Sequence, residues 1–160
     1  MPGFARADAE SIADIEQFLC RATGEPVALG TVWIADGLLG RTVARVARAR
    51  AITFGSLIFF AEGPDRPRAE PEVQTSLERF ESLLVHECVH VWQYRREGWM
   101  FFLRQYLKSY FSGIWVRGSM SRLARHAAYV AIPLEQEAFR LELSWSEARS
   151  SGRRGSRRDG

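Results

Sequence analysis

Residues 83–98 read LLVHECVHVWQYRREG, and the two histidines in this stretch stand four positions apart. Residues four apart share one face of an α-helix, so His86 and His90 can direct their imidazole rings at a single point. Glu87 follows directly and is turned by about 100° from His86 around the helix axis. The stretch is therefore an HExxH motif, and the apolar residues on both sides of it predict a buried helix.

Two histidines and a carboxylate on a buried helix indicate a metal site. Burying these groups costs free energy unless they find polar partners, and a metal ion is the simplest partner. Zinc accepts nitrogen ligands tetrahedrally and keeps one position open for water. It lowers the pKa of that water to roughly 7, and Glu87 can accept the proton as the water attacks a carbonyl carbon. The alternative is that both histidines are partly buried and simply hydrogen-bonded.

An open zinc site needs a third protein ligand, and the final predicted helix, 133–149, offers two carboxylates. Pro133 suits the first turn of this helix. Glu135 and Glu137 flank its apolar stripe on opposite sides, so helical geometry alone does not choose between them. The alternative is that both belong to a solvated face. The stripe consists of Leu134, Ala138, Leu141 and Trp145.

The motif and its surroundings resemble a known family. HECVHVWQYRREG at 86–98, followed by YVAIPLEQEA at 129–138, is similar to small bacterial gluzincin-type zinc metallopeptidase domains. The closest pattern is that of HExxH domains known partly from contractile injection system loci. AITFGSLIFFA at 51–61 also resembles the hairpin that precedes the zinc helix in this family. The resemblance covers about residues 50–142.

The resemblance implies the third ligand. In related gluzincins this ligand is a Glu in an E-x-x-A pattern, which falls here on Glu135, with Ala138 three residues later. Many gluzincins have Asp or Asn four residues after the ligand, where it orients a zinc histidine. Here that position is Phe139, and Glu137 or Glu142 is the expected substitute. The departure leaves a non-catalytic zinc site as the alternative.

Further side chains are candidates to support the site. His126 and Tyr129 precede the final helix, and either can donate to the oxyanion that amide hydrolysis develops. The alternative is a surface histidine and a packed tyrosine. Gln93, three residues after His90, is expected to bond a backbone group near the site. Cys88 faces away from the histidines and is expected to be a small core residue.

The remaining patterns predict an α+β fold that is mostly helical with a small sheet. Together with the resemblance, this implies a minimal gluzincin-like zincin with a small hairpin and a long HExxH helix. Gly55 indicates a tight turn inside the segment 51–61. The resemblance implies that a strand of this hairpin lies at a sheet edge, where a substrate peptide can add as a further strand. The expected helices are 8–22, 38–50, 72–97, 99–116 and 133–149, with a strand or extended arm at 26–36 and a loop at 62–71.

The helix at 99–116 is apolar nearly all round. Such a helix is usually buried, so we expect it to cover the zinc helix. The alternative is a membrane-surface helix or a hydrophobic lid, which its aromatic residues favour. The charges of Arg104 and Lys108 argue against a helix that spans a membrane.

Charge and cysteine content exclude several classes of protein. The chain has a formal net charge of +3, but all of it lies in residues 150–160, which predict a disordered basic tail after a single domain at 1–149. The charge therefore does not indicate a nucleic-acid partner. Two cysteines do not form a disulfide framework, and no secretory signal or transmembrane segment is visible. A cytoplasmic location is therefore expected.

These observations and the resemblance predict a zinc-dependent metallopeptidase that acts on a peptide or protein substrate. His86, His90 and Glu135 are the expected Zn²⁺ ligands. Glu87 is the expected general base, which then donates its proton to the leaving amine. One alternative is a non-catalytic zinc-binding interaction module of a secretion or toxin-associated assembly. The other is a membrane-surface adaptor built on the helix at 99–116.

Overall fold

The computed structural model describes residues 4–35, 37–47, 50–61 and 70–156. It is mostly helical with one small sheet, which confirms the predicted α+β class. The elements in chain order are β1 (Phe4–Arg6), α1 (Ala9–Thr23), β2 (Trp33–Ala35), α2 (Gly37–Ala47), β3 (Ala51–Phe54), β4 (Leu57–Phe60), α3 (Glu70–Glu97), α4 (Trp99–Arg117), α5 (Arg122–Val130) and α6 (Pro133–Ser156).

The four strands form one sheet in the order β1-β2-β4-β3. β1 and β2 are antiparallel, β2 and β4 are parallel, and β3 and β4 form the predicted hairpin. Gly55 has a φ of +63° at the hairpin turn, a conformation that glycine adopts without a steric penalty. In the strand order given above, β3 lies at an edge of the sheet, as expected. In the described part of the segment 26–36, residues 26–35, the only strand is the three-residue β2. β1 was not predicted.

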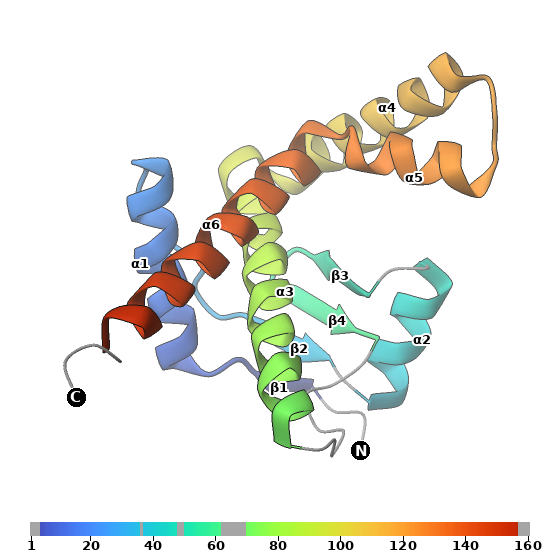
Figure 1. Cartoon of the computed structure of the whole chain (residues 1–160). Coiled ribbons are helices and arrows are strands. Elements are labelled where there is room, and N and C mark those ends of the chain that lie inside the picture. Colours follow the sequence, from blue (N-terminus) through green and yellow to red (C-terminus); the bar gives the residue numbers. More distant parts are fainter. Residues whose placement is uncertain (1–3, 36, 48–49, 62–69, 157–160) are drawn as a thin grey trace.

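α3 packs against the sheet, and α6 crosses α3 (Figure 1). The main hydrophobic core lies between the sheet, α1, α3 and α6, and includes Leu19, Ile58, Val85 and Val89. Cys88 is fully buried in this core, as predicted. Burying each aliphatic side chain contributes about 1.5–3 kcal/mol, which offsets the cost of placing polar residues on the same helix.

α4 and α5 pack against each other and project away from the sheet (Figure 1). Gly98, with a φ of +80°, separates α3 from α4, and Gly118 ends α4. The prediction that the helix at 99–116 is buried is wrong, because Phe102 is its one residue classed as buried. α5 covers only one side of α4. α5 itself was not predicted; its N-cap is Ser121, whose hydroxyl accepts from the Ala124 N–H at 3.1 Å.

α6 is longer than predicted. It continues to Ser156 rather than ending at Arg149, so residues 150–156 are helical and not a disordered tail. The Ser150 hydroxyl donates to the Ser146 carbonyl at 2.8 Å. Arginine is a good helix former, and cations near a helix C-terminus interact favourably with the helix dipole. Residues 157–160 and the predicted loop up to residue 69 lie outside the described residues.

Candidate metal centre

His86, His90 and Glu135 come together at one point, and all three are buried. Their candidate ligand atoms lie within 4.8 Å of one another. The Nε2 atom of His86 is 3.3 Å from Oε2 of Glu135, and Nε2 of His90 is 3.6 Å from Oε1. α3 supplies the histidines from successive turns, and the first turn of α6 supplies the glutamate. The structure thus brings together the three residues predicted as ligands.

The residues present fit a divalent metal ion. Oε2 of Glu135 is buried without a hydrogen-bond partner among the described residues. A buried acceptor left without a donor costs about 1–3 kcal/mol, and more when it is charged. A cation seated between the three side chains would satisfy this oxygen. Two imidazoles and one carboxylate are also a donor set that zinc accepts in sites with one open position.

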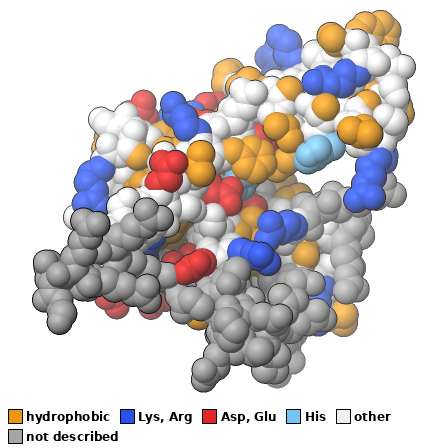
Figure 2. All heavy atoms as spheres, viewed as in Figure 1, with side chains coloured by type: hydrophobic (Ala, Val, Ile, Leu, Met, Phe, Trp, Pro, Cys, Tyr) orange, Lys and Arg blue, Asp and Glu red, His pale blue; other side chains and the backbone are white. Residues whose placement is uncertain are grey.

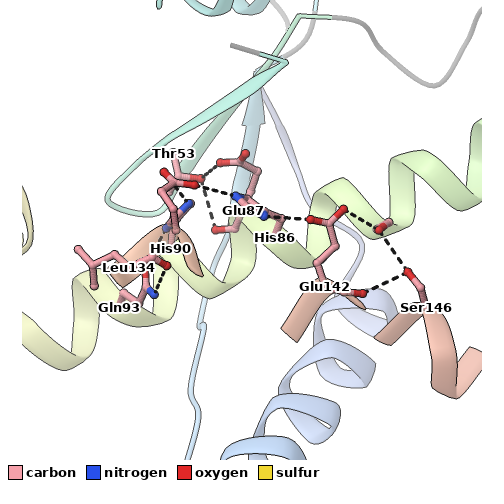
Figure 3. A network of polar contacts seen from close by, with 10 residues as sticks. Thr53, His86, Glu87, His90, Gln93, Leu134, Glu142 and Ser146 are labelled. Carbon is pink, nitrogen blue, oxygen red and sulfur yellow. Dashed lines mark hydrogen bonds and ion pairs between the residues drawn. The ribbon is translucent and has the colours of Figure 1, made fainter. Parts of the chain in front are cut away.

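Both histidines are held through the nitrogen that faces away from this point (Figure 3). Nδ1 of His86 lies 3.1 Å from Oε2 of Glu142, and Nδ1 of His90 lies 2.8 Å from Oε1 of Gln93. Ser82 donates to the other oxygen of Glu142 at 2.8 Å. These contacts fix the ring orientations and leave both Nε2 atoms directed at Glu135.

Glu142 takes the orienting role that Phe139 does not fill. The carboxylate of Glu142 lies three residues further along α6 and still reaches His86, because residues three apart share a helix face. The ring of Phe139 packs against the His86 ring, with centroids 4.7 Å apart. The sequence had offered Glu137 and Glu142 as substitutes, and the structure shows Glu142 in contact with the histidine.

Glu137 has a supporting role behind His90. Gln93 donates to the Leu134 carbonyl at 3.0 Å, the backbone contact predicted for it, and to Oε2 of Glu137 at 2.8 Å. Arg96 donates to both oxygens of Glu137 at 3.2 and 3.0 Å. Glu137 therefore ties α3 to α6 and does not join the ligand group.

Glu87 is buried beside the ligand group, and its Oε2 accepts a hydrogen bond of 2.7 Å from the Thr53 hydroxyl. Burial raises the pKa of Glu87, although His90 and Thr53 act in the opposite direction. A carboxyl group with a raised pKa is suited to accept and return a proton near neutral pH. Thr53 comes from the edge strand β3 and was missed by the sequence analysis. A hydroxyl at an inward position of an apolar strand was the signal available.

The charges of the site favour an ionised Glu135. Burial alone would raise the pKa of Glu135, but the neighbouring imidazoles of His86 and His90 hold it well below its usual range. Burial likewise disfavours the charged form of His86, yet the nearby Glu135 carboxylate and the contact with Glu142 raise its pKa to about 9. Because a metal ligand must be deprotonated, cation binding at this point would be accompanied by proton release.

Two tyrosines approach Glu135 from the projecting helices. Burial, together with the charge of Glu135 and hydrogen bonding to it, raises the pKa of Tyr129 and of Tyr106 above the usual range. Both phenols are therefore neutral donors. Tyr129 was predicted, whereas Tyr106 was missed because α4 was interpreted as a plain apolar cover. His126 is exposed on α5, and none of the contacts described for this part of the chain joins it to the site.

A family model described as the eCIS core domain matches residues 12–98, more than half of the chain. The abbreviation refers to extracellular contractile injection systems. This finding confirms the predicted link to contractile injection systems, although the matched segment begins well before residue 50. It contains most of α1 and the whole of β2, α2, β3, β4 and α3, and it ends before α4 and Glu135. No curated protein and no solved structure matches the chain.

Proposed function

The chain belongs to the eCIS core domain family, and we propose that it is a zinc-dependent hydrolase of peptide bonds serving a contractile injection system. The observation that carries the proposal is the buried meeting of His86, His90 and Glu135, with Glu87 beside it. A bound zinc ion would supply a Lewis acid for the scissile carbonyl and lower the pKa of an attacking water to roughly 7. Ligand positioning, proton transfer and stabilisation of the oxyanion are carried out by the side chains of the protein.

The first task of the side chains is to hold the ligand geometry. Glu142 and Gln93 fix the two imidazole rings, and losing such partners typically lowers metal affinity or activity by about 10–100-fold. The Glu142 contact weakens the main observation that favoured a non-catalytic site, which was the apolar Phe139 at the expected orienting position. A purely structural site would also have no use for a buried Glu87.

Glu87 is the proposed proton carrier. Its carboxylate accepts the proton of the attacking water and then donates it to the nitrogen of the leaving amine. The Thr53 hydroxyl holds one of its oxygens, so the carboxylate is oriented before a substrate arrives. Burial raises its pKa, which makes the carboxylate a stronger base than an exposed glutamate.

The two neutral phenols are the proposed oxyanion donors. Tyr129 and Tyr106 lie against Glu135, so their hydroxyls border the same point as the ligand group. A donor aimed at the developing negative charge typically contributes about 10²–10³-fold to the rate. Tyr129 retains the role predicted from the sequence, and Tyr106 replaces His126 in it.

A peptide is the proposed substrate because of the sheet edge beside Glu87. β3 pairs with β4 on one side and, among the described strands, with none on the other. An edge strand offers its backbone groups to an extended chain, which binds by main-chain hydrogen bonds. Since Thr53 belongs to this same strand, such a chain would pass close to Glu87.

The experiment begins with the metal content of protein purified without added zinc. We expect about one zinc per chain, because the two imidazoles and one carboxylate form one site with three protein ligands. The metal should be lost in His86→Ala and in Glu135→Ala. The matched control is His126→Ala, which removes an exposed histidine and should keep the metal. A parent protein that binds no divalent metal would overturn the proposal.

Activity is then measured on a broad peptide library. Glu87→Gln should keep the zinc and lose hydrolysis by about 10²–10⁴-fold, because proton transfer is lost while the ligands remain. If the zinc-loaded parent cleaves nothing while the zinc-binding results hold, the site binds metal without catalysis.

A further inference from the structure

The projecting pair of helices carries a large exposed apolar surface that the proposed hydrolase does not use. We call residues 99–130 the arm. It lies outside the segment matched by the family, which ends at residue 98. Its base adjoins the site, where Phe102 packs near the His90 ring and Tyr106 and Tyr129 approach Glu135. The exposed large hydrophobic side chains of the arm are Trp99, Met100, Phe101, Leu107, Phe111, Trp115, Val116, Met120, Leu123 and Val130.

Four of the exposed residues of α4 share one face of the helix. Met100, Leu107, Phe111 and Trp115 recur at spacings of seven, four and four residues, which places them on one side. The opposite side packs closely against α5, where a Cβ added at Gly113 would lie 3.0 Å from Ala128 Cβ. α5 therefore covers the inner side of α4 and leaves the aromatic face exposed.

The arm is also strongly basic. Residues 99–134 contain no aspartate or glutamate and have a net charge of +5, supplied by Arg104, Lys108, Arg117, Arg122 and Arg125. Because the whole chain has a net charge of +3, the remainder carries −2. Figure 2 shows basic and hydrophobic side chains interspersed over the projecting part of the molecule. The positive charge is thus concentrated where the apolar side chains are exposed.

We propose that the arm binds the surface of a membrane that contains anionic lipids. Trp and Phe side chains favour the boundary between headgroups and acyl chains, and basic residues are attracted to anionic headgroups. Long Arg and Lys side chains can extend their charged ends to the headgroups while their stems lie among apolar groups. None of the described helices is long and apolar enough to cross a bilayer, so the arm lies in the interface.

The charge pattern favours a lipid surface over a protein groove as the binding partner of the exposed face of α4. Arg104 lies within the face of α4 that carries Phe111 and Trp115, and Lys108 lies at its edge. An apolar protein groove would have to desolvate these charges, which is costly without buried acidic partners. A headgroup layer receives them in water while the neighbouring rings insert. The mixture of charges and rings on one face is therefore typical of interfacial binding.

The test is co-sedimentation of the full chain with vesicles of phosphatidylcholine alone or of an equal mixture with phosphatidylglycerol. We expect binding to the mixed vesicles, weaker binding to the neutral ones, and a decrease with added salt because screening weakens the headgroup attraction. The double variant Arg104→Gln/Lys108→Gln should bind about 30-fold more weakly, since each cation contributes roughly fivefold. Phe111→Ser/Trp115→Ser should lower binding at least about tenfold at every salt concentration.

Two control variants carry the same changes away from the arm. Arg21→Gln/Arg41→Gln removes two exposed cations from α1 and α2, and Leu38→Ser/Leu143→Ser removes two exposed leucines from α2 and α6. Both should bind as the parent does. Circular dichroism of every variant establishes that the helices are retained.

Several results would overturn the proposal. One is that the parent protein stays in the supernatant with both vesicle types at low salt. Another is that the control variants lose as much binding as the arm variants. A dimer in sedimentation equilibrium that Trp115→Ser dissociates, without vesicle binding, would assign the face to a second copy. His86→Ala should still bind vesicles, so failure of the proposed metal site leaves this test decisive.

Discussion

α3 and α4 are consecutive helices joined at Gly98, yet α3 buries polar side chains whereas α4 exposes apolar ones. α3 buries the polar residues His86, Glu87, His90 and Gln93, each 6% exposed or less. α4 leaves most of its large apolar residues in solvent, among them Trp115 at 87% exposure. The difference shows that the composition of a helix does not determine its burial. What decides it is whether other elements pack around the helix, and α3 lies between the sheet and α6.

The largest expected difference between the two helices is in catalysis. Glu87→Gln on α3 should lower the rate of peptide hydrolysis by about 10²–10⁴-fold, because the proton carrier is lost. Trp115→Ser on α4 should leave hydrolysis of a soluble peptide unchanged. Steady-state rates of the zinc-loaded proteins check both expectations. Equal loss in both variants would mean that the exposed end of α4 also takes part in catalysis.

A matched pair of leucines tests the comparison in stability. Leu84→Ala on α3 should lower the free energy of unfolding by about 2–5 kcal/mol, because the side chain is buried in the core. Leu107→Ala on α4 should cost less than about 1 kcal/mol, since this side chain is 42% exposed. Urea unfolding followed by circular dichroism measures both. Similar costs would mean that α4 is covered in solution.

Glu142→Ala probes the contacts that allow α3 to bury its histidines. We expect zinc affinity to fall by about 10–100-fold, because the His86 ring loses the partner of its Nδ1 atom. Competition with a chromogenic chelator gives the affinity. The matched control is Glu147→Ala, an exposed glutamate on the same helix, and it should bind zinc as the parent does. An unchanged affinity in Glu142→Ala would contradict the orienting role.

The smallest expected effect concerns the exposed ring at the far end of α4. Trp115→Ser should change the free energy of unfolding by no more than about 0.5 kcal/mol, because the side chain has few contacts to lose. The same urea titration measures it. A destabilisation comparable to that of Leu84→Ala would place the ring against another part of the protein and remove the contrast between the helices.

The parts of the fold that depend on local signals could be predicted from the sequence. Gly55 marked the β3–β4 hairpin, Gly98 marked the end of α3, and the HExxH spacing placed two ligands on one face. The choice of Glu135 needed the family pattern, because both glutamates of the first turn flank the same apolar stripe. Glu142 was one of two candidates until the contact with His86 distinguished them.

The parts that depend on how distant elements meet were beyond the sequence. Thr53 reaches Glu87 from a strand 34 residues earlier, and Tyr106 reaches Glu135 from a helix interpreted as a cover. Neither approach leaves a mark in local spacing. The exposure of α4 was missed for the same reason, since a hydrophobic helix is buried only if the rest of the chain folds around it.

The two connections of the arm to the body, Gly98 and residues 131–132, give it mechanical leverage. A helix the length of α4 extends about 28 Å, so a rotation of about 10° at its base sweeps the tip through about 5 Å. Both connections adjoin the site. The ring centroids of Phe102 and His90 lie 5.9 Å apart, and Glu135 follows Ile132 by three residues. A force applied at the tip of the arm would therefore reach the two helices that carry the ligands.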